Sequence, residues 1–595
     1  MGWIVAYTQR SNEITQLGER YIMITFHELK RQAREAKQKP TVGKLAILGD
    51  CATQLLATAI KGYGYAHGLN LDIFDADYNQ IEVQVIDAGS ELYRFAPDHI
   101  LLFMCTEKLY ECFCETKPSD RGKFAEVAFR KIKGHWDSIL SQRVVHILQY
   151  SFVEKDDGIW GNFSSKREDS FLFQLRKLNL LMMEGAQQNK SVFLLDLNAI
   201  QRQMGSGVFF DEKYYYSAKT PISLTAMPLA AKQVIDVLDA LRGRVKKCVI
   251  LDLDNTLWGG VIGDDGLSGI EIGELGAGHA FSEFQMWLRE LRRRGVLLAV
   301  CSKNNEDTAK EPFEKHPDMV LRLSDISMFV ANWQDKASNI RVIQQTLNIG
   351  MDSMVFLDDN PFERELVRSL IPEITVPELP EDPALYCTVL KQMNLFETAS
   401  FSAEDAVRTE QYQAEAGRVA LQKQFHSMDE YLMSLEMRAE VKPFDAFHYP
   451  RIAQLTQRSN QFNLRTVRYT EEDIGRIAED EDYLTLYFTL RDKFGSHGLI
   501  SVVILQKEGD TLFVNTWLMS CRVLKRGMEE FIANSIMRLA KEKGFRCVVG
   551  EYLQTPKNRM VEHLYEQLGF VPLGGGRYEM AAENYVPQKT YIVEG

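Results

Sequence analysis

One stretch decides the fold of the middle of this chain: Lys246-Lys247-Cys248-Val249-Ile250-Leu251-Asp252-Leu253-Asp254-Asn255-Thr256. Its apolar run predicts a buried parallel strand, and two carboxylates, Asp252 and Asp254, come directly after it. At the carboxyl end of such a strand the backbone turns into a loop, where both carboxylates can converge on a ligand. The stretch therefore predicts an acidic site at the edge of an open α/β sheet.

Two further apolar runs end in polar side chains. The run at 296–302 ends in the hydroxyl of Ser302, and the run at 354–357 is followed by Asp358 and Asp359. An apolar stripe over residues 281–291 predicts a crossover helix, and Lys336 opens a second helical pattern. The order strand, helix, strand, helix, strand predicts a doubly wound parallel sheet.

In this order, the Asp-x-Asp-x-Thr pentapeptide, Ser302, Lys336 and the Asp358-Asp359 pair resemble the four motifs of the haloacid dehalogenase (HAD) phosphotransferases. The resemblance implies that Asp252 is the nucleophile and forms an aspartyl-phosphate. It implies that Asp254 protonates the leaving group and then activates water. Ser302 and Lys336 would hold the phosphate that is transferred.

The resemblance also implies a Mg²⁺ ion, a hard cation that prefers oxygen ligands. Asp252, Asp358 or Asp359, and the backbone carbonyl of Asp254 would supply those ligands. The carboxylate pair leaves open which of Asp358 and Asp359 touches the metal. Such an ion reduces the repulsion between an anionic nucleophile and an anionic substrate.

Longer stretches at 258–266, 298–305 and 358–365 resemble the FkbH-like family of HAD proteins, and the resemblance runs from about residue 44 to about residue 575. Members of that family load a glyceryl unit from 1,3-bisphosphoglycerate onto an acyl carrier protein. The resemblance therefore implies a small phosphorylated metabolite as substrate and a carrier protein as partner. Two alternatives stay open: a phosphatase of a sugar or sugar-acid phosphate in polysaccharide biosynthesis, and a binding scaffold with a vestigial site.

We expect four parts: an N-terminal extension (1–40), a second α/β domain (41–225), the Rossmann-like HAD domain (226–395) and a C-terminal α+β domain (405–595). A helix is predicted at 21–37. The second α/β domain, with strands at 44–49, 99–104, 143–148 and 192–196, resembles the SGNH hydrolase fold, with Cys51 at the place of its nucleophile. The histidine of that family's dyad is missing, because no His occurs between His146 and His279. We therefore expect this domain to bind rather than to catalyse.

The C-terminal part resembles the GNAT acyltransferase fold. Strands are predicted at 483–490, 498–505 and 511–517, followed by a helix at 528–542, a strand at 546–550 and a helix at 561–567. Two roles stay open for Cys521, a thiol beside cationic residues: it accepts an acyl group, or it is a small buried residue that closes a strand. The resemblance implies that a phosphopantetheine arm or acyl-CoA is bound by Arg522, Lys525, Arg526, Gly527, Asn558 and Tyr565.

Composition limits the class of protein. With 595 residues, 45% of them hydrophobic and 25% charged, the chain is typical of a multidomain globular protein. A net charge of −13 argues against sequence-independent nucleic-acid binding. Nine scattered cysteines suggest reduced thiols, and no apolar run is long enough for a membrane span or a signal peptide. The expected location is the cytoplasm.

Overall fold

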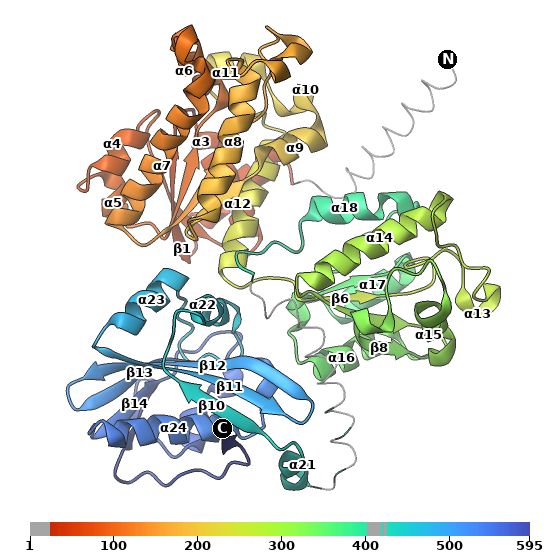
Figure 1. Ribbon diagram of the computed structural model, residues 1–595, viewed down its shortest axis with the longest axis vertical. Coiled ribbons are helices and arrows are strands. Elements are labelled where there is room, and N and C mark those ends of the chain that lie inside the picture. Colours follow the sequence, from red (N-terminus) through yellow and green to blue (C-terminus); the bar gives the residue numbers. More distant parts are fainter. Residues whose placement is uncertain (1–23, 402–417, 419–420, 422–424, 426) are drawn as a thin grey trace. The chain divides into compact units, whose positions relative to one another are not determined.

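The computed structural model describes residues 24–401, 418, 421, 425 and 427–595, which belong to two units, one ending at Leu238 and one beginning at Asp239 (Figure 1). Of the helix predicted at 21–37, residues 21–23 lie outside the described residues, and the helix α2 is observed at Phe26–Ala36. α2 begins after Thr25 because Thr25 and Glu28 form a reciprocal capping box.

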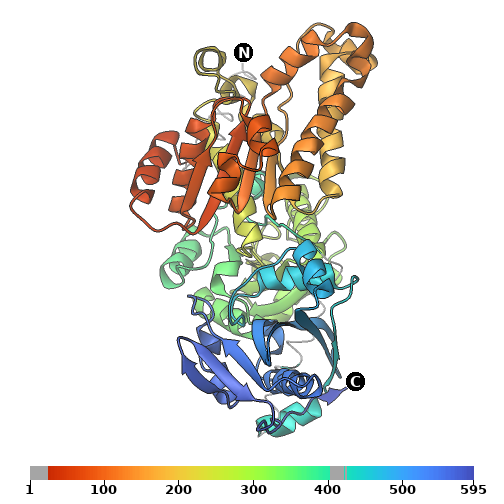
Figure 2. The same ribbon diagram turned by 90° about the vertical axis from the view of Figure 1, so that its left-hand side faces the viewer.

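The first unit contains a parallel sheet of five strands in the order β2-β1-β3-β4-β5. Within β1, Ala46 and Leu48 pack into one core with residues of α7 (Phe124–Gln142) and α8 (Phe171–Gln187), whereas Leu45 and Ile47, equally buried, face the opposite side. Both faces are therefore covered by helices (Figure 2). The strands are β1 (Gly43–Gly49), β2 (Leu71–Asp75), β3 (His99–Phe103), β4 (His146–Tyr150) and β5 (Val192–Leu195).

The central part of the second unit is a parallel sheet in the order β8-β7-β6-β9. Residues of β6 alternate between two cores: Val249 packs with α14 (Gly276–Arg293), and Ile250 packs with α16 (Lys336–Leu347). The predicted doubly wound α/β fold is confirmed. The strands are β6 (Cys248–Leu251), β7 (Leu297–Ser302), β8 (Ile326–Ala331) and β9 (Met354–Leu357).

β8 is the one strand of this sheet that the sequence pattern did not single out. It pairs only with β7 and lies at the sheet edge. Its residues 328–330 are only half-buried. An edge strand lacks the continuous apolar run of a central parallel strand, so its pattern is weaker.

The C-terminal part is an α+β fold on a mixed sheet in the order β15-β16-β14-β13-β12-β11-β10-β17. The parallel pair β13–β14 matches only Thr511–Val514 with Cys547–Gly550, and beyond Val514 β13 leaves β14 and stays paired with β12 as far as Met519. The strands, helix, strand and helix that the sequence predicted between 483 and 567 occur in that order, whereas β10, α22, α23 and β15 to β17 were not predicted. The main elements are β10 (Arg438–Lys442), α22 (Tyr449–Arg458), α23 (Glu471–Glu479), β11 (Tyr483–Asp492), β12 (Gly495–Glu508), β13 (Thr511–Met519), α24 (Met528–Glu542), β14 (Cys547–Glu551), α25 (Leu564–Gln567), β15 (Val571–Gly574), β16 (Arg577–Ala581) and β17 (Val593–Glu594).

None of the helices in the described part of the chain is both long and apolar enough to cross a membrane.

Candidate functional site

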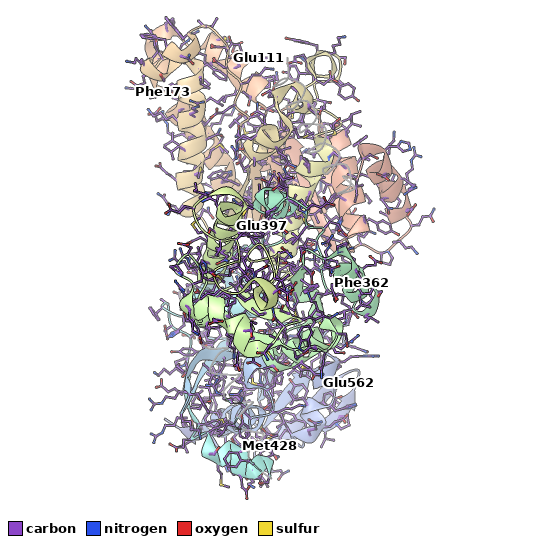
Figure 3. The ribbon with its side chains drawn as sticks, turned by 90° about the vertical axis from the view of Figure 1, so that its right-hand side faces the viewer. Glu111, Phe173, Phe362, Glu397, Met428 and Glu562 are labelled. Carbon is purple, nitrogen blue, oxygen red and sulfur yellow. The ribbon has the colours of Figure 1, made fainter. Side chains whose placement is uncertain are left out.

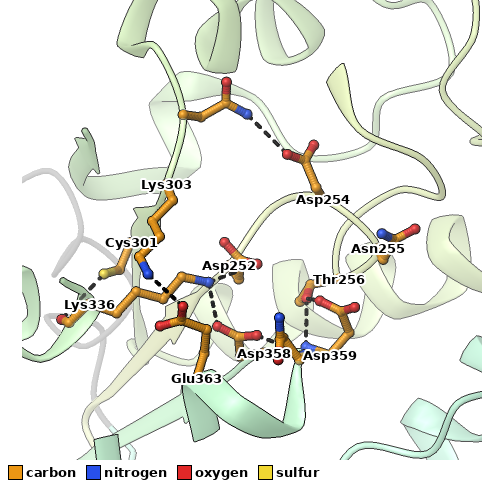
Figure 4. A network of polar contacts seen from close by, with 12 residues as sticks. Asp252, Asp254, Asn255, Thr256, Cys301, Lys303, Lys336, Asp358, Asp359 and Glu363 are labelled. Carbon is orange, nitrogen blue, oxygen red and sulfur yellow. Dashed lines mark hydrogen bonds and ion pairs between the residues drawn. The ribbon is translucent and has the colours of Figure 1, made fainter. Parts of the chain in front are cut away.

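The carboxyl edge of the β8-β7-β6-β9 sheet gathers the HAD-type residues that the sequence predicted (Figure 4). Asp252 follows β6, Ser302 ends β7 and Asp358 follows β9, while Lys336 begins α16 after β8. β6 pairs in register with both β7 and β9, so the ends of these three strands meet at one place. The predicted convergence at the sheet edge is observed.

Lys336 is the electrostatic centre of the site. Its Nζ lies 3.0 Å from Asp252 Oδ2 and 2.5 Å from Asp358 Oδ2, and all three side chains are buried. Burial alone lowers the pKa of Lys336, but the two carboxylates outweigh it and the net shift is upward. Burial and the neighbouring Asp252 raise the pKa of Asp358 to about 7, although Lys336 opposes the shift. The single ammonium of Lys336 therefore lies beside more carboxylate groups than its charge can neutralise.

The donor set fits a hard divalent cation. Asp252, Asp358 and Asp359 each offer a carboxylate oxygen, and the three oxygens lie within 4.8 Å of one another. Thr256 Oγ1 donates a hydrogen bond to Asp359 Oδ1 at 3.3 Å and accepts one from the Asp359 N–H at 3.1 Å. Both members of the Asp358-Asp359 pair thus reach the cluster. Three oxygens and excess negative charge are what Mg²⁺ binding requires.

Asp254 faces away from this cluster, so only its backbone carbonyl remains as a predicted metal ligand. Asp254 Oδ1 accepts hydrogen bonds from Trp258 Nε1 and the Ile262 N–H, each at 3.0 Å. Oδ2 accepts one from Asn304 Nδ2 at 3.1 Å. Burial raises the pKa of Asp254, while the bonds from Ile262 and Trp258 lower it in part. A carboxyl group with a raised pKa suits the predicted role of acid and base.

Sequence reasoning assigned no role to three residues that support the site. Asn304 belongs to the quoted 298–305 stretch, but its bond to Asp254 spans 50 positions. Lys303 pairs with Glu363 at 2.6 Å. Arg364 donates to the backbone carbonyls of Asp358 at 2.8 Å and Asp359 at 2.6 Å, and so fixes the loop that holds both carboxylates. For each of these residues, the sequence offered one indication: its position in a stretch that resembles the FkbH-like family.

Two aromatic side chains are exposed in the loops at the same edge of the sheet. Trp333 lies between β8 and Lys336 and is 78% exposed. Phe362, which Figure 3 labels, lies in the first turn of α17 (Pro361–Leu370), three residues after Asp359, and is 69% exposed. Exposed aromatic residues beside a site are typical of surfaces that contact a large partner.

Within the second unit, Cys521 lies far from this edge. The Cys521 carbonyl accepts a hydrogen bond from Asn348 Nδ2 at 2.5 Å, and Asn348 is the C-cap of α16. Lys336 is the first residue of the same helix, whose 12 residues make it about 18 Å long. The acid cluster and Cys521 therefore sit at opposite ends of one helix.

Cys521 and Ser520 line a cavity of about 850 Å³, within the range of small-molecule sites. Asp352 and Glu373 also line it. Cationic side chains outnumber these two carboxylates, which suits a ligand with phosphate groups. The cationic lining residues are Lys247, Arg341, Arg451, Arg458 and Lys557.

Two residues of the predicted phosphate loop have a left-handed backbone, and its cationic side chains differ in placement. Lys525 has φ +59° and is exposed, so it adopts the left-handed conformation that a glycine usually supplies there. Gly527, with φ +79°, precedes α24. Arg526 is only 5% exposed and lies 3.7 Å from Asp492, so its charge faces the protein interior. The side chain of Arg522 lies outside the described residues.

Asn558 and Tyr565, both predicted ligand contacts, are in the interior. Asn558 is fully buried and donates to the carbonyls of Asn463 and Leu553, each at 2.9 Å. Tyr565 is 1% exposed and packs against Trp517. Both side chains shape the fold in this arrangement, and their contact with a cofactor stays a prediction.

Comparisons with known proteins match the chain in two regions. The family model described as the FkbH N-terminal domain matches residues 44–239. The crystal structure of the N-terminal part of the protein BF1531 from Bacteroides fragilis, which contains a phosphatase domain and is complexed with Mg, is 48% identical. That match covers 63% of this chain and 100% of the other, with a TM-score of 0.61.

Two further solved structures match about a quarter of the chain. The ribosomal-protein-S18-alanine N-acetyltransferase from Escherichia coli is 17% identical over 24% of this chain and 92% of the other, with a TM-score of 0.19. The GNAT domain of S. lividans PAT is 19% identical over 25% of this chain and 94% of the other, with a TM-score of 0.20. A search of the curated proteins finds no match to the chain.

Proposed function

Because the chain belongs to the FkbH-like family of HAD-superfamily phosphatases, we propose that its central domain removes phosphate from a small phosphorylated metabolite through Asp252. The observation that carries this proposal is the buried cluster in which Lys336 bridges Asp252 and Asp358 beside Asp359. The Lys336 ammonium, 3.0 Å from Asp252 Oδ2, holds this carboxylate in place, which a nucleophile requires. Asp254, outside this cluster, is free for proton transfer.

The proposed steps use these residues in turn. Asp252 attacks the phosphorus, and the P–O bond to the leaving group breaks. The carboxyl group of Asp254 gives its proton to the leaving oxygen, and Asp254 then takes a proton from the water that hydrolyses the aspartyl-phosphate. Lys336 and Ser302 would hold the transferring group. Mg²⁺ bound by Asp252, Asp358 and Asp359 would supply positive charge for the phosphoryl oxygens.

We further propose that the substrate resembles 1,3-bisphosphoglycerate and that its acyl unit is passed to a carrier-protein thiol. In that transfer a thiol sulfur attacks the acyl carbon, the acyl phosphate leaves, and the thiol proton goes to solvent. Asp252 would therefore act on the ester phosphate, so that the acyl anhydride is kept for the thiol. The exposed Trp333 and Phe362 beside the site support a large partner. The separation of about 18 Å along α16 excludes direct transfer from the acid cluster to Cys521 in this arrangement. A carrier arm that reaches both places removes that obstacle.

A second candidate is a phosphatase of a sugar or sugar-acid phosphate whose C-terminal domain acylates an amine or hydroxyl, in surface polysaccharide biosynthesis. The same separation of the two sites favours it, because two independent reactions need no shared intermediate. The left-handed Lys525 and Gly527 also leave the loop before α24 in a conformation suited to a CoA phosphate.

Intact-mass spectrometry and phosphate release, both with Mg²⁺ and 1,3-bisphosphoglycerate, separate these candidates. Asp252→Asn is expected to abolish release of the ester phosphate, whereas Asp264→Asn, an exposed carboxylate after the same strand, is expected to retain it. With a phosphopantetheine-bearing carrier protein added, a glyceryl adduct that is lost in Cys521→Ala but kept in Cys112→Ala supports acyl transfer. Phosphate release with no adduct in any variant supports the second candidate. Full activity of Asp252→Asn overturns both.

A further inference from the structure

A second cluster of ligand-type side chains lies in the first unit, at the carboxyl ends of β1 and β3. The two strands pair in parallel, with Gly49 opposite Phe103, so the register places Cys51 opposite Cys105 just beyond the strand ends. β1 lies between β2 and β3: the chain passes from β1 to β2 on one side and then crosses back to β3 on the other side, where the strand order reverses. This is the switch point at which open parallel sheets bind their ligands.

The side chains there converge. A carboxylate oxygen of Asp50 and the sulfur atoms of Cys51 and Cys105 all lie within 4.8 Å of one another. Both thiols are 2% exposed, and the half-buried Asp50 leaves a route from solvent. Asp50 Oδ1 accepts a hydrogen bond from the Cys105 N–H at 2.8 Å, which fixes the carboxylate beside the thiols. Glu107 and Lys108 are the nearest charged neighbours of Asp50, and their charges offset each other.

The chemistry of this set differs from that of a nucleophilic cysteine. Burial raises the pKa of Cys51 well above its usual range, so the free thiol stays protonated and is a poor nucleophile. Two thiols and one carboxylate are, by contrast, a ligand set for Zn²⁺, with Zn–S bonds of about 2.3 Å and Zn–O bonds of about 2.0–2.2 Å. Sulfur and oxygen atoms within 4.8 Å of one another can be reached by one such ion.

Space for a fourth ligand adjoins the cluster. A cavity of about 10 Å³ is lined by Cys105, Thr106, Glu107 and Ser151, among others, and this is about the room that one water molecule needs. A zinc site with three protein ligands and one water position is of the open type, which can polarise a bound ligand.

We propose that Asp50, Cys51 and Cys105 form a Zn²⁺ site with one open position at the carboxyl edge of the first sheet. Binding is balanced as Zn²⁺ plus two thiols giving a zinc dithiolate and two protons, with no change of oxidation state. The acceptor of those protons is the solvent. The proposal stands apart from the phosphatase reaction, since it concerns the other unit and a different metal.

The test uses the reduced full-length protein after removal of metals by a chelator, titrated with Cd²⁺ and with Zn²⁺. We expect a thiolate-to-Cd²⁺ charge-transfer band at one equivalent, and displacement of that Cd²⁺ by Zn²⁺. Cys51→Ser and Cys105→Ser are each expected to weaken binding at least tenfold. The control Cys112→Ser/Cys114→Ser removes two exposed thiols and is expected to retain the band.

A measurement on the wild-type protein alone guards against variants that fail to fold. In weakly buffered solution near pH 7, Zn²⁺ binding is expected to release two protons, because a thiol with an ordinary pKa of about 8.5 is mostly protonated and binds zinc as the thiolate. Absence of a charge-transfer band in the reduced wild-type protein overturns the proposal. A band that disappears only in Cys112→Ser/Cys114→Ser, or Zn²⁺ binding without proton release, overturns it equally.

Discussion

The two parallel sheets of this chain carry different donors at the same topological position. β1 and β6 both lie inside their sheets, and each ends in residues that meet those of the neighbouring strand. After β6 the donors are carboxylate oxygens around a buried ammonium, whereas after β1 they are two thiols and one carboxylate. The fold supplies the place, and the residue types decide the chemistry.

The difference has electrostatic consequences. At the β6 edge Lys336 keeps several carboxylates close together, and the remaining negative charge favours Mg²⁺. At the β1 edge burial keeps the thiols neutral, and it raises the pKa of Asp50 to about 6. A softer ion that displaces thiol protons is therefore favoured there. The predictions below test whether the two edges differ in this way.

The largest expected effect is that of Lys336→Met. This change removes the only ammonium among the described residues that lies within 4 Å of Asp252 and Asp358, and it leaves buried carboxylates facing one another. We expect a loss of about 3–5 kcal/mol in the free energy of unfolding, measured by urea titration without Mg²⁺. Phosphate release should fall by at least 10³-fold, because the phosphoryl group loses its charge partner.

Lys303→Met is the matched control, since Lys303 pairs with Glu363 at 2.6 Å but is more than a third exposed. Its effect on the free energy of unfolding should stay below about 1 kcal/mol. Equal destabilisation by the two variants would show that burial of the ammonium is not what distinguishes this edge.

The second prediction concerns pH and Asp358. Its pKa rises from 3.8 to about 7 on folding because of burial and Asp252, so the folded state binds a proton more tightly than the unfolded state. This stabilising contribution is complete below pH 3.8 and is lost as the pH rises through about 7. In Mg²⁺-free buffer, the free energy of unfolding of the wild-type protein, relative to that of Asp358→Asn, should therefore fall between pH 4 and pH 7.

The expected fall is on the order of a few kcal/mol. Saturating Mg²⁺ should reduce it, since the ion favours the ionised carboxylate in the folded state. A difference between the two proteins that is independent of pH would contradict the assignment of excess negative charge to this edge.

A smaller effect is expected for Asn304→Ala. Asn304 positions Asp254, and its removal leaves Oδ2 without the 3.1 Å bond that favours the ionised form. The pKa that governs proton transfer should shift upward, and kcat should fall about tenfold with little change in KM. The measurement is the pH profile of kcat.

Asn339→Ala serves as control, because Asn339 is a buried amide of the same domain that bonds to Asn332 instead of a catalytic carboxylate. We expect Asn339→Ala to lower stability and to leave the pH profile of kcat unshifted. If Asn304→Ala behaves in the same way, Asn304 has a structural role and Asp254 is not tuned by it.

Local and non-local features differ in how well sequence predicts them. Asp252, Ser302 and Asp358 could be assigned because each lies at the end of an apolar run, and parallel strands bring such ends together. The bond from Asn304 to Asp254 and the meeting of Cys51 with Cys105 depend on loop paths and register across 50 or more residues, as the separation of Asp50 from Cys105 illustrates. The hydrophobic periodicity of the sequence does not indicate such contacts.

The loop before α24 shows a different limit of prediction from sequence. Lys525 has the left-handed backbone conformation that a glycine usually supplies, although it is not a glycine. The Arg526 side chain points toward Asp492, which lies 34 positions earlier in the chain. This direction could not be inferred from charge alone. Sequence patterns predict elements and their ends well, and side-chain directions poorly.

The smallest effect is expected for Cys301→Ser, which removes a thiol close in sequence to the carboxylate cluster at the β6 edge. Cys301 precedes Ser302, the last residue of β7, but alternation along the strand turns the Cys301 side chain into the core with Ile340, and burial raises its pKa. Its Sγ lies 3.7 Å from the Lys336 carbonyl, a bond that a serine hydroxyl can replace. We expect phosphate release within about twofold of the wild-type rate, a loss of about 1 kcal/mol in the free energy of unfolding, and an unchanged Cd²⁺ band. If the Cd²⁺ band were lost in Cys301→Ser, the thiol that binds the metal would lie at the β6 edge. The contrast between the two sheets would then fail, because the position of a thiol in the sequence, and not the direction of its side chain, would decide whether it binds metal.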